Sequence, residues 1–158
     1  MSILEFIGEI GRAEKIYRKP NIPRGKADNA ILSYCSKLRY NDIEVLIDET
    51  VFGNAKAGII ITANAIYGKE SFCDPFQYSL DKITSILAKK SLVTTSIYIN
   101  QRPVIKLTQP TGAALVYLFN RIEHYLKHMK AIPKIATEDY PETRSPAPQP
   151  CEVTLLTE

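Results

Sequence analysis

The stretch at residues 43–69, IEVLIDETVFGNAKAGIIITANAIYGK, decides the fold class of this chain. Its first run, residues 43–51, alternates apolar and polar side chains, as a half-buried strand does. Its second run, residues 58–62, is β-branched and too short for a typical helix, which predicts a buried strand. A turn at residues 52–56 joins the two runs. Because parallel strands need a link of about a dozen residues, these two strands are expected to be antiparallel.

Further short strands and one long helix are predicted toward the C-terminus. The strands are predicted at residues 66–69, 76–80, 83–90, 93–100 and 104–108. After Thr111, a candidate helix cap, apolar side chains recur at helical spacing as far as Met129. Six or seven strands followed by one amphipathic helix are typical of the α+β class. We expect a bent antiparallel sheet, or a partly open barrel, that the C-terminal helix caps.

A helix is also predicted ahead of the strands, at residues 27–40. Asp28 is its candidate cap. Its apolar face consists of Ile31, Tyr34, Cys35 and Leu38.

The first 26 residues predict a short amphipathic helix at residues 3–10, which Ser2 caps, and a basic linker that Pro20 and Pro23 interrupt. This helix either docks on the domain or lies on an anionic membrane surface. The membrane-surface candidates are Phe6, Ile7, Ile10, Arg12, Lys15, Arg18 and Lys19.

Residues 131–158 differ in composition from the rest of the chain. They hold five of its ten prolines, and their net charge is −3. We expect an extended acidic tail, because proline disfavours both helix and central strand. Its apolar island at residues 153–156 is either a frayed terminus or a short strand that adds to a sheet edge. The predicted division is therefore residues 1–26, 27–130 and 131–158.

Composition excludes several classes of protein. The 158 residues fit about one domain, and the 45% apolar and 23% charged fractions are those of an ordinary globular protein. The net charge of +3 is small for a nucleic-acid binder. No apolar run reaches the roughly 18 residues of a membrane span, and no export signal is expected. Three separated cysteines without a CxxC pair favour a reducing compartment, so we expect a cytoplasmic protein.

A motif at the first predicted turn has a physical reason at each position. Gly53 and Gly58 permit backbone conformations that a Cβ would penalise. Asp48 and Thr50 are expected to accept hydrogen bonds from backbone groups of the turn, and Phe52 is expected to cover the edge of the core.

The same motif, with Lys56 projecting from the turn, resembles that of the small bacterial pleckstrin-homology-like domains. The resemblance covers residues 41–130. It implies a bent antiparallel sheet with a C-terminal helix, and an accessory or adaptor role in place of an enzymatic one. Lipid-binding relatives in eukaryotes carry several cations in the corresponding loop, whereas this loop offers only Lys56.

The sequence marks no catalytic or metal-binding constellation. His124 and His128 have the spacing of a metal pair, but no third ligand is evident. Cys73 has no histidine that could activate it, which predicts an inert thiol. No phosphate-binding glycine motif occurs. We therefore expect neither enzymatic activity nor a cofactor.

Cations on the predicted strands and loops are the candidate binding residues, together with one tyrosine. They are Lys56, Lys69, Lys89, Lys90, Tyr98, Arg102 and Lys106. Such cations can receive a phosphate or an acidic peptide. The alternative is a solvated face that protects strand edges from aggregation.

Binding is accordingly the predicted class of function. The first hypothesis is a bacterial cytoplasmic adaptor that presents a strand edge, or the groove beside the last helix, to a segment of a partner protein. The alternative is a peripheral membrane module that binds anionic lipid through the N-terminal helix and basic linker. Self-association is a third hypothesis. Nucleic acid is not an expected partner.

Overall fold

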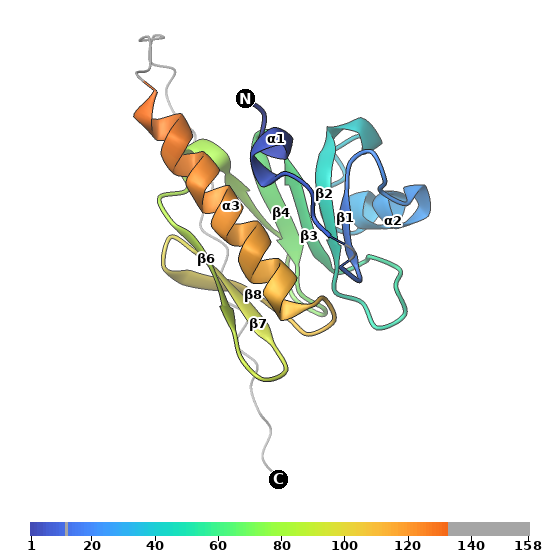
Figure 1. Cartoon of the computed structure of the whole chain (residues 1–158). Helices are drawn as coiled ribbons and strands as arrows, with labels where there is room; N and C mark the ends of the chain where they lie inside the picture. The colour runs from blue at the N-terminus through green and yellow to red at the C-terminus, as the bar shows by residue number, and fades with distance from the viewer. Residues whose placement is uncertain (12, 133–158) are drawn as a thin grey trace.

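The computed structural model describes residues 1–11 and 13–132, so the predicted acidic tail lies outside the described residues from residue 133 onward, as does its apolar island. The described part is an α+β fold with two antiparallel sheets and a C-terminal helix (Figure 1). The helices are α1 (Ile3–Ile7), α2 (Arg24–Tyr34) and α3 (Gly112–Ala131), with 3-10 turns at Tyr40–Asp42 and Leu80–Lys82. The strands are β1 (Ile16–Arg18), β2 (Ile43–Asp48), β3 (Gly58–Thr62), β4 (Ala65–Lys69), β5 (Phe76–Ser79), β6 (Ile86–Lys90), β7 (Thr95–Ile99) and β8 (Arg102–Leu107).

The strands divide into a five-stranded sheet, in the order β1-β2-β3-β4-β5, and a three-stranded sheet, in the order β6-β7-β8. The predicted single bent sheet is therefore replaced by two sheets, and the described residues form no closed barrel. The division occurs where the chain passes through the 3-10 turn after β5. The backbone N–H groups of Thr84 and Ser85 then donate to the Asn100 side chain, at 2.6 and 3.3 Å, ahead of β6.

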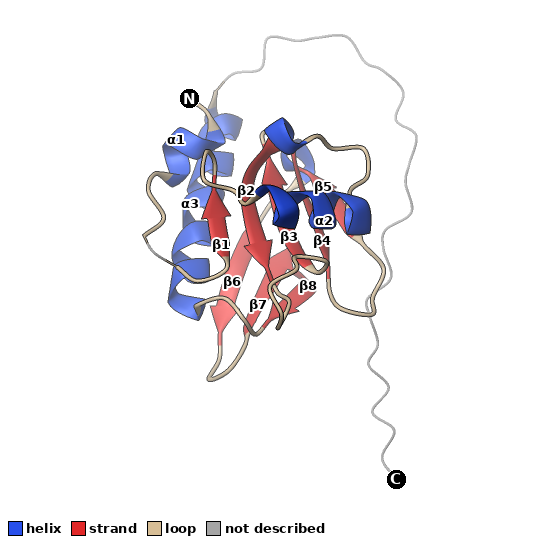
Figure 2. Ribbon diagram, turned by 90° about the vertical axis from the view of Figure 1, so that its right-hand side faces the viewer, coloured by secondary structure: helices blue, strands red, loops and turns tan. Residues whose placement is uncertain are grey.

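The main hydrophobic core lies between the two sheets and α3. Val45 and Ile61 contribute to it from the five-stranded sheet, Ile97 from the three-stranded sheet and Phe119 from α3. On its other face the five-stranded sheet is covered by α2, as Figure 2 shows. Because both faces are covered, β3 is buried at every position, as the β-branched run predicts.

The helix before the strands is displaced from its predicted position. Helix α2 begins at Arg24, directly after Pro23, and ends at Tyr34. Asp28 therefore lies inside the helix, where its carboxylate accepts from Arg24 Nε at 3.3 Å, and the prediction that it caps the helix is wrong. The residues that α2 buries include Ala27 and Ala30, whose small side chains allow close approach to the sheet.

Strand β1 lies in the segment that the sequence predicts as a basic linker. Ile16 pairs with Ile47 of β2, so this segment forms one edge of the five-stranded sheet. Three residues with a single buried apolar side chain are too short for a period-two pattern to stand out.

Helix α1 is docked on the body of the protein. Ser2 caps it through a capping box, as predicted. Ile3 and Ile7 are buried in the main core, and Arg121 Nε of α3 donates to the Phe6 carbonyl oxygen at 2.9 Å. The apolar face of α1 therefore packs against the core of the protein.

Candidate functional site

Three loops of the two sheets lie at one end of the molecule. We call this end the loop end and define it as residues 49–57, 70–75 and 91–94, which are the β2–β3, β4–β5 and β6–β7 connections. Antiparallel pairing sends the first two of them to the same end of the five-stranded sheet. All three lie at the lower end of Figures 1 and 2.

The start of α3 joins the two sheets at this end. The Glu49 side chain accepts the backbone N–H of Thr108 at 2.7 Å and that of Gln109 at 3.3 Å. A Cβ on Gly112 would lie 2.8 Å from Thr95 Oγ1, at the first residue of β7. The turn before α3 therefore touches both the β2–β3 loop and the β6–β7 hairpin.

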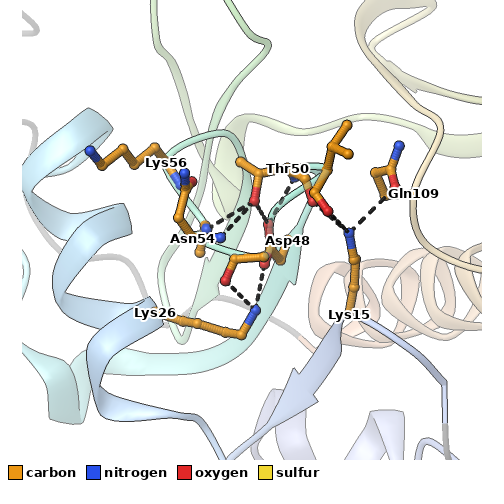
Figure 3. Close-up of polar contacts among 10 residues, drawn as sticks. Lys15, Lys26, Asp48, Thr50, Asn54, Lys56 and Gln109 are labelled. Carbon is orange, nitrogen blue, oxygen red and sulfur yellow. Dashed lines mark hydrogen bonds and ion pairs between the residues drawn. The ribbon is translucent and has the colours of Figure 1, made fainter.

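A buried polar network holds the β2–β3 loop (Figure 3). The Asp48 carboxylate is fully buried and accepts from Lys26 Nζ at 2.7 Å, from Thr50 N at 2.8 Å and from Thr50 Oγ1 at 2.5 Å. Thr50 Oγ1 in turn accepts the backbone N–H of Asn54 at 2.8 Å and that of Ala55 at 3.2 Å. This confirms that Asp48 and Thr50 satisfy backbone donors of the turn.

Two lysines tie the loop to other elements. Lys26 of α2 also donates to the Gly53 carbonyl oxygen at 2.5 Å, and Lys15 donates to the Thr50 carbonyl oxygen at 2.5 Å. Burial by itself would raise the pKa of Asp48, but the hydrogen bonds from Lys26 and Thr50 outweigh burial and hold the pKa below its ordinary value of 3.8. Asp48 is therefore a carboxylate at neutral pH, paired with the Lys26 ammonium.

Both motif glycines adopt positive φ values, as predicted. Gly53 has φ 71° and Gly58 has φ 143°. A Cβ on Gly58 would lie 1.9 Å from the Ile47 carbonyl oxygen, so no other residue fits there without a backbone shift. The prediction that Phe52 covers the core edge is wrong, because its side chain is 94% exposed at the tip of the loop. The fully buried residue of this loop is Ala55, which lies in a second hydrophobic cluster between α2 and the outer face of the five-stranded sheet.

Exposed apolar side chains are concentrated at the loop end. Five of them expose 70% or more of their area: Val51, Phe52, Phe72, Leu92 and Val93. Among the described residues, the only other large apolar side chains with that exposure are Met1 and Leu32. Each of the three loops contributes at least one of the five.

The structure brings most of the predicted cations to this same end. Lys56 lies in the β2–β3 loop, Lys69 ends β4, and Lys89 and Lys90 end β6, while Lys106 lies one residue before the end of β8. Lys89 Nζ lies 5.0 Å from the centre of the Tyr98 ring. Arg102 begins β8 and therefore lies at the opposite end.

The N-terminal membrane candidates do not form a free surface in the described structure. Ile7 is buried, and Phe6 and Ile10 are partly buried against the core. Arg18 donates to the Leu4 carbonyl oxygen at 3.1 Å, and Lys19 to that of Asn41 at 2.7 Å. Lys15 belongs to the loop contacts described above, and Arg12 lies outside the described residues.

A cavity of about 420 Å³ lies between the C-terminal end of α2 and the outer face of β4 and β5. Its lining includes Leu32, Tyr34 and Lys37 on one side, and Tyr67 and Gln77 on the other. Lys37 is exposed at its rim. The Tyr34 hydroxyl is buried and has no hydrogen-bond partner among the described residues.

Strand β5 is an open edge beside this cavity. Leu80 N–H donates to the Asn64 carbonyl oxygen at 2.9 Å, which fixes the hydrogen-bonding phase of the β4–β5 pair. Because paired residues of an antiparallel ladder alternate between bonded and non-bonded positions, Gln77 and Ser79 direct their backbone N–H and C=O groups away from β4. No other described strand pairs with that edge.

The described residues offer no metal-binding group, and their cysteines are not available as nucleophiles. No three His, Cys, Asp or Glu side chains gather there to hold a metal ion. Burial raises the pKa of the Cys35 thiol to about 12, which makes it a poor nucleophile. Cys73 is disulfide-bonded and is not the inert free thiol that the sequence predicts. None of the described helices is long and apolar enough to span a bilayer.

Sequence reasoning missed the residues that define both surfaces. Phe72, Leu92 and Val93 are apolar residues at or beside predicted turns, and that position is a signal that could have identified them. The open edge at Gln77 had no such signal, because only strand pairing shows which strand lies outermost.

Searches against protein-family models, curated proteins and solved structures found no match to this chain.

Proposed function

We propose that the chain is a non-catalytic adaptor module that binds an extended segment of a partner protein along β5. The observation that carries this proposal is the open edge of β5, which lies directly beside a cavity. Strand addition supplies main-chain hydrogen bonds, and pockets beside the edge select side chains.

The backbone of β5 provides the attachment points. Gln77 and Ser79 each leave one N–H and one C=O without a strand partner among the described residues. Four such groups on alternate residues match the spacing of an incoming strand, because alternate residues of a strand face the same neighbour.

The cavity defines the side chains that the partner segment would carry. Leu32 and Tyr67 offer apolar surface, while Lys37 adds a positive charge at the rim. An apolar residue that enters the cavity, with Asp or Glu beside it to meet Lys37, fits this lining.

The remaining properties of the proposal come from the sequence. The resemblance to pleckstrin-homology-like domains supports a binding role over an enzymatic one, and the bacterial cytoplasmic setting stays a prediction. The same edge in a second copy of this chain is a competing occupant.

The test uses the full chain as bait for a phage-displayed library of random decapeptides. Gln77→Pro removes the outward N–H without breaking a bond to β4, and Gln77→Ala is its matched control because it keeps that N–H. We expect enriched sequences that contain an apolar residue next to Asp or Glu. These should bind the parent chain and the Gln77→Ala variant, and should lose about tenfold or more in affinity on Gln77→Pro or Lys37→Glu.

Two results would contradict the proposal. One is a library without enriched sequences. The other is an enriched peptide that binds the Gln77→Pro variant as well as it binds the parent chain. A light-scattering mass of a dimer that reverts to a monomer in Gln77→Pro would instead assign the edge to self-association.

A further inference from the structure

We propose that the loop end docks this protein on the surface of an anionic lipid bilayer, with the tips of all three loops inserted among the lipids. This surface does not include β5, although Pro75 of the β4–β5 loop also lines the cavity beside that strand. It is also distinct from the N-terminal helix that the sequence nominates for membrane contact. The inference therefore stands independently of peptide binding.

The first argument is the distribution of exposed apolar side chains. Phe52, Phe72 and Leu92 expose 94%, 105% and 102% of their area, each at the tip of a different loop. No described element covers them. Large apolar groups gathered on one exposed face of a protein mark a surface that meets an apolar partner.

The second argument is that the first loop is already ordered. The carboxylate of Asp48, the ammonium of Lys26 and the hydroxyl of Thr50 bond to one another and to the loop backbone. A tip held in this way loses little conformational freedom on insertion, so less of the binding free energy is lost to ordering. The network explains how a chain can keep Phe52 exposed on a fixed loop.

The third argument is charge, which selects a bilayer of anionic lipid as the occupant. Each apolar tip has a lysine within four residues of it in the sequence: Lys56 in the loop of Phe52, Lys69 at the end of β4 before Phe72, and Lys90 at the end of β6 before Leu92. Lys89 and Lys106 add to this set from the three-stranded sheet, while Glu70 and Asp74 are the opposing acids that these loops leave accessible to solvent. Apolar groups that enter the acyl boundary, with cations set at headgroup level, are the pattern of interfacial binding.

The absence of tryptophan from the chain allows a direct test. Phe52→Trp and Leu92→Trp, each in the full chain, place a single fluorophore at a loop tip. Leu32→Trp is the matched control, because Leu32 is 80% exposed on α2, away from the loop end. The probe is a vesicle of phosphatidylcholine with a minor fraction of phosphatidylglycerol, compared with phosphatidylcholine alone.

We expect the emission of the Phe52→Trp and Leu92→Trp variants to shift to the blue with the anionic vesicles, and that of the Leu32→Trp variant to stay unchanged. In vesicle sedimentation, Phe52→Ser combined with Leu92→Ser should reduce the bound fraction about tenfold, whereas Leu32→Ser should not reduce it. Lys56→Glu with Lys90→Glu should also weaken binding about tenfold, and Arg102→Glu at the opposite end should not.

Three outcomes would overturn the inference. The first is a parent chain that sediments with neither vesicle. The second is a protein that binds without a shift in the emission of the tip fluorophores. The third is a Leu32→Trp emission that shifts as much as the other two. The substituted side chains are exposed, so a far-ultraviolet circular dichroism spectrum identical to that of the parent chain confirms that loss of binding is not loss of fold.

Discussion

Asp48 shows how one side chain can determine the shape of a loop. Its carboxylate has no exposed area, yet it stays charged because three donors converge on it from Lys26 and Thr50. A buried charge without such partners would destabilise the fold by roughly several kcal/mol. The hydrogen bonds from the lysine and the threonine therefore compensate the burial of the Asp48 carboxylate. The same contacts fix the loop backbone at Gly53 and thereby position the exposed Phe52 next to it.

We predict that Asp48→Asn lowers the free energy of unfolding by about 2–3 kcal/mol, because Lys26 then loses its counter-charge. Asp28→Asn is the control, since its ion pair with Arg24 is exposed and is worth about 0.5 kcal/mol or less. Urea denaturation at neutral pH measures the free energy of unfolding of both variants. Equal effects of the two substitutions would show that the network does not support the loop.

The same carboxylate predicts a dependence of stability on pH. The pKa of Asp48 is lowered in the folded protein, so the unfolded chain binds the proton more readily. The contribution of Asp48 to the free energy of unfolding is fully present above its ordinary pKa of 3.8. That contribution is lost as the pH falls below this value toward the pKa of Asp48 in the folded protein. The free energy of unfolding should therefore fall less steeply with acidification in Asp48→Asn than in the parent chain. Parallel curves would contradict this assignment.

At the scale of elements, the connection from β2 to β3 depends on Gly58. Its φ of 143° and the proximity of the Ile47 carbonyl oxygen exclude a side chain. The consequence is a loop that enters β3 in the register Asp48↔Gly58, with the carboxylate directly below the turn.

We predict that Gly58→Ala destabilises the protein by about 3 kcal/mol, because both the backbone conformation and the contact with Ile47 are unfavourable for a Cβ. Gly25→Ala is a matched control in α2, where a Cβ meets nothing within 4 Å. That substitution should leave stability unchanged or raise it by about 0.5–1 kcal/mol, because alanine favours helix. Thermal unfolding of the two variants compares them. A tolerated Gly58→Ala would show that β3 can shift register.

At the scale of the whole molecule, one core holds both sheets, α3 and the N-terminal helix together. Ile7 of α1 belongs to the same cluster as Ile61 of the five-stranded sheet and Ile97 of the three-stranded sheet. A membrane role for α1 would require Ile3 and Ile7 to leave this core. The loop end needs no such rearrangement.

We predict that Ile7→Ala destabilises the protein by about 2–4 kcal/mol, as expected for a large-to-small change in a core. It should also make the segment at residues 8–11 the first site of limited proteolysis, because α1 loses its anchor on α3. Leu32→Ala, at an exposed position, should change stability by less than about 0.5 kcal/mol. An Ile7→Ala variant as stable as the parent chain would show that α1 is not docked in solution.

Local sequence determined the elements whose pattern is strong. β3 at residues 58–62 and α3 after Thr111 were predictable, because a β-branched run and a long apolar stripe at helical spacing each favour one structure. The roles of Asp48 and Thr50 were predictable as well, since short polar side chains bond to backbone groups close to them in sequence.

Tertiary structure decided everything that depends on contacts between distant residues. The partition into two sheets, the pairing of β1 with β2 and the outermost place of β5 follow from strand pairing, which no local pattern encodes. The position of Phe52, Phe72 and Leu92 at one end also depends on tertiary structure. Antiparallel pairing places the first two loops at the same end of the five-stranded sheet, and the packing of the three-stranded sheet against it brings the third loop to that end. Local patterns reflect the preferences of a residue for its near neighbours, whereas both proposed binding surfaces arise only when separate segments fold against one another.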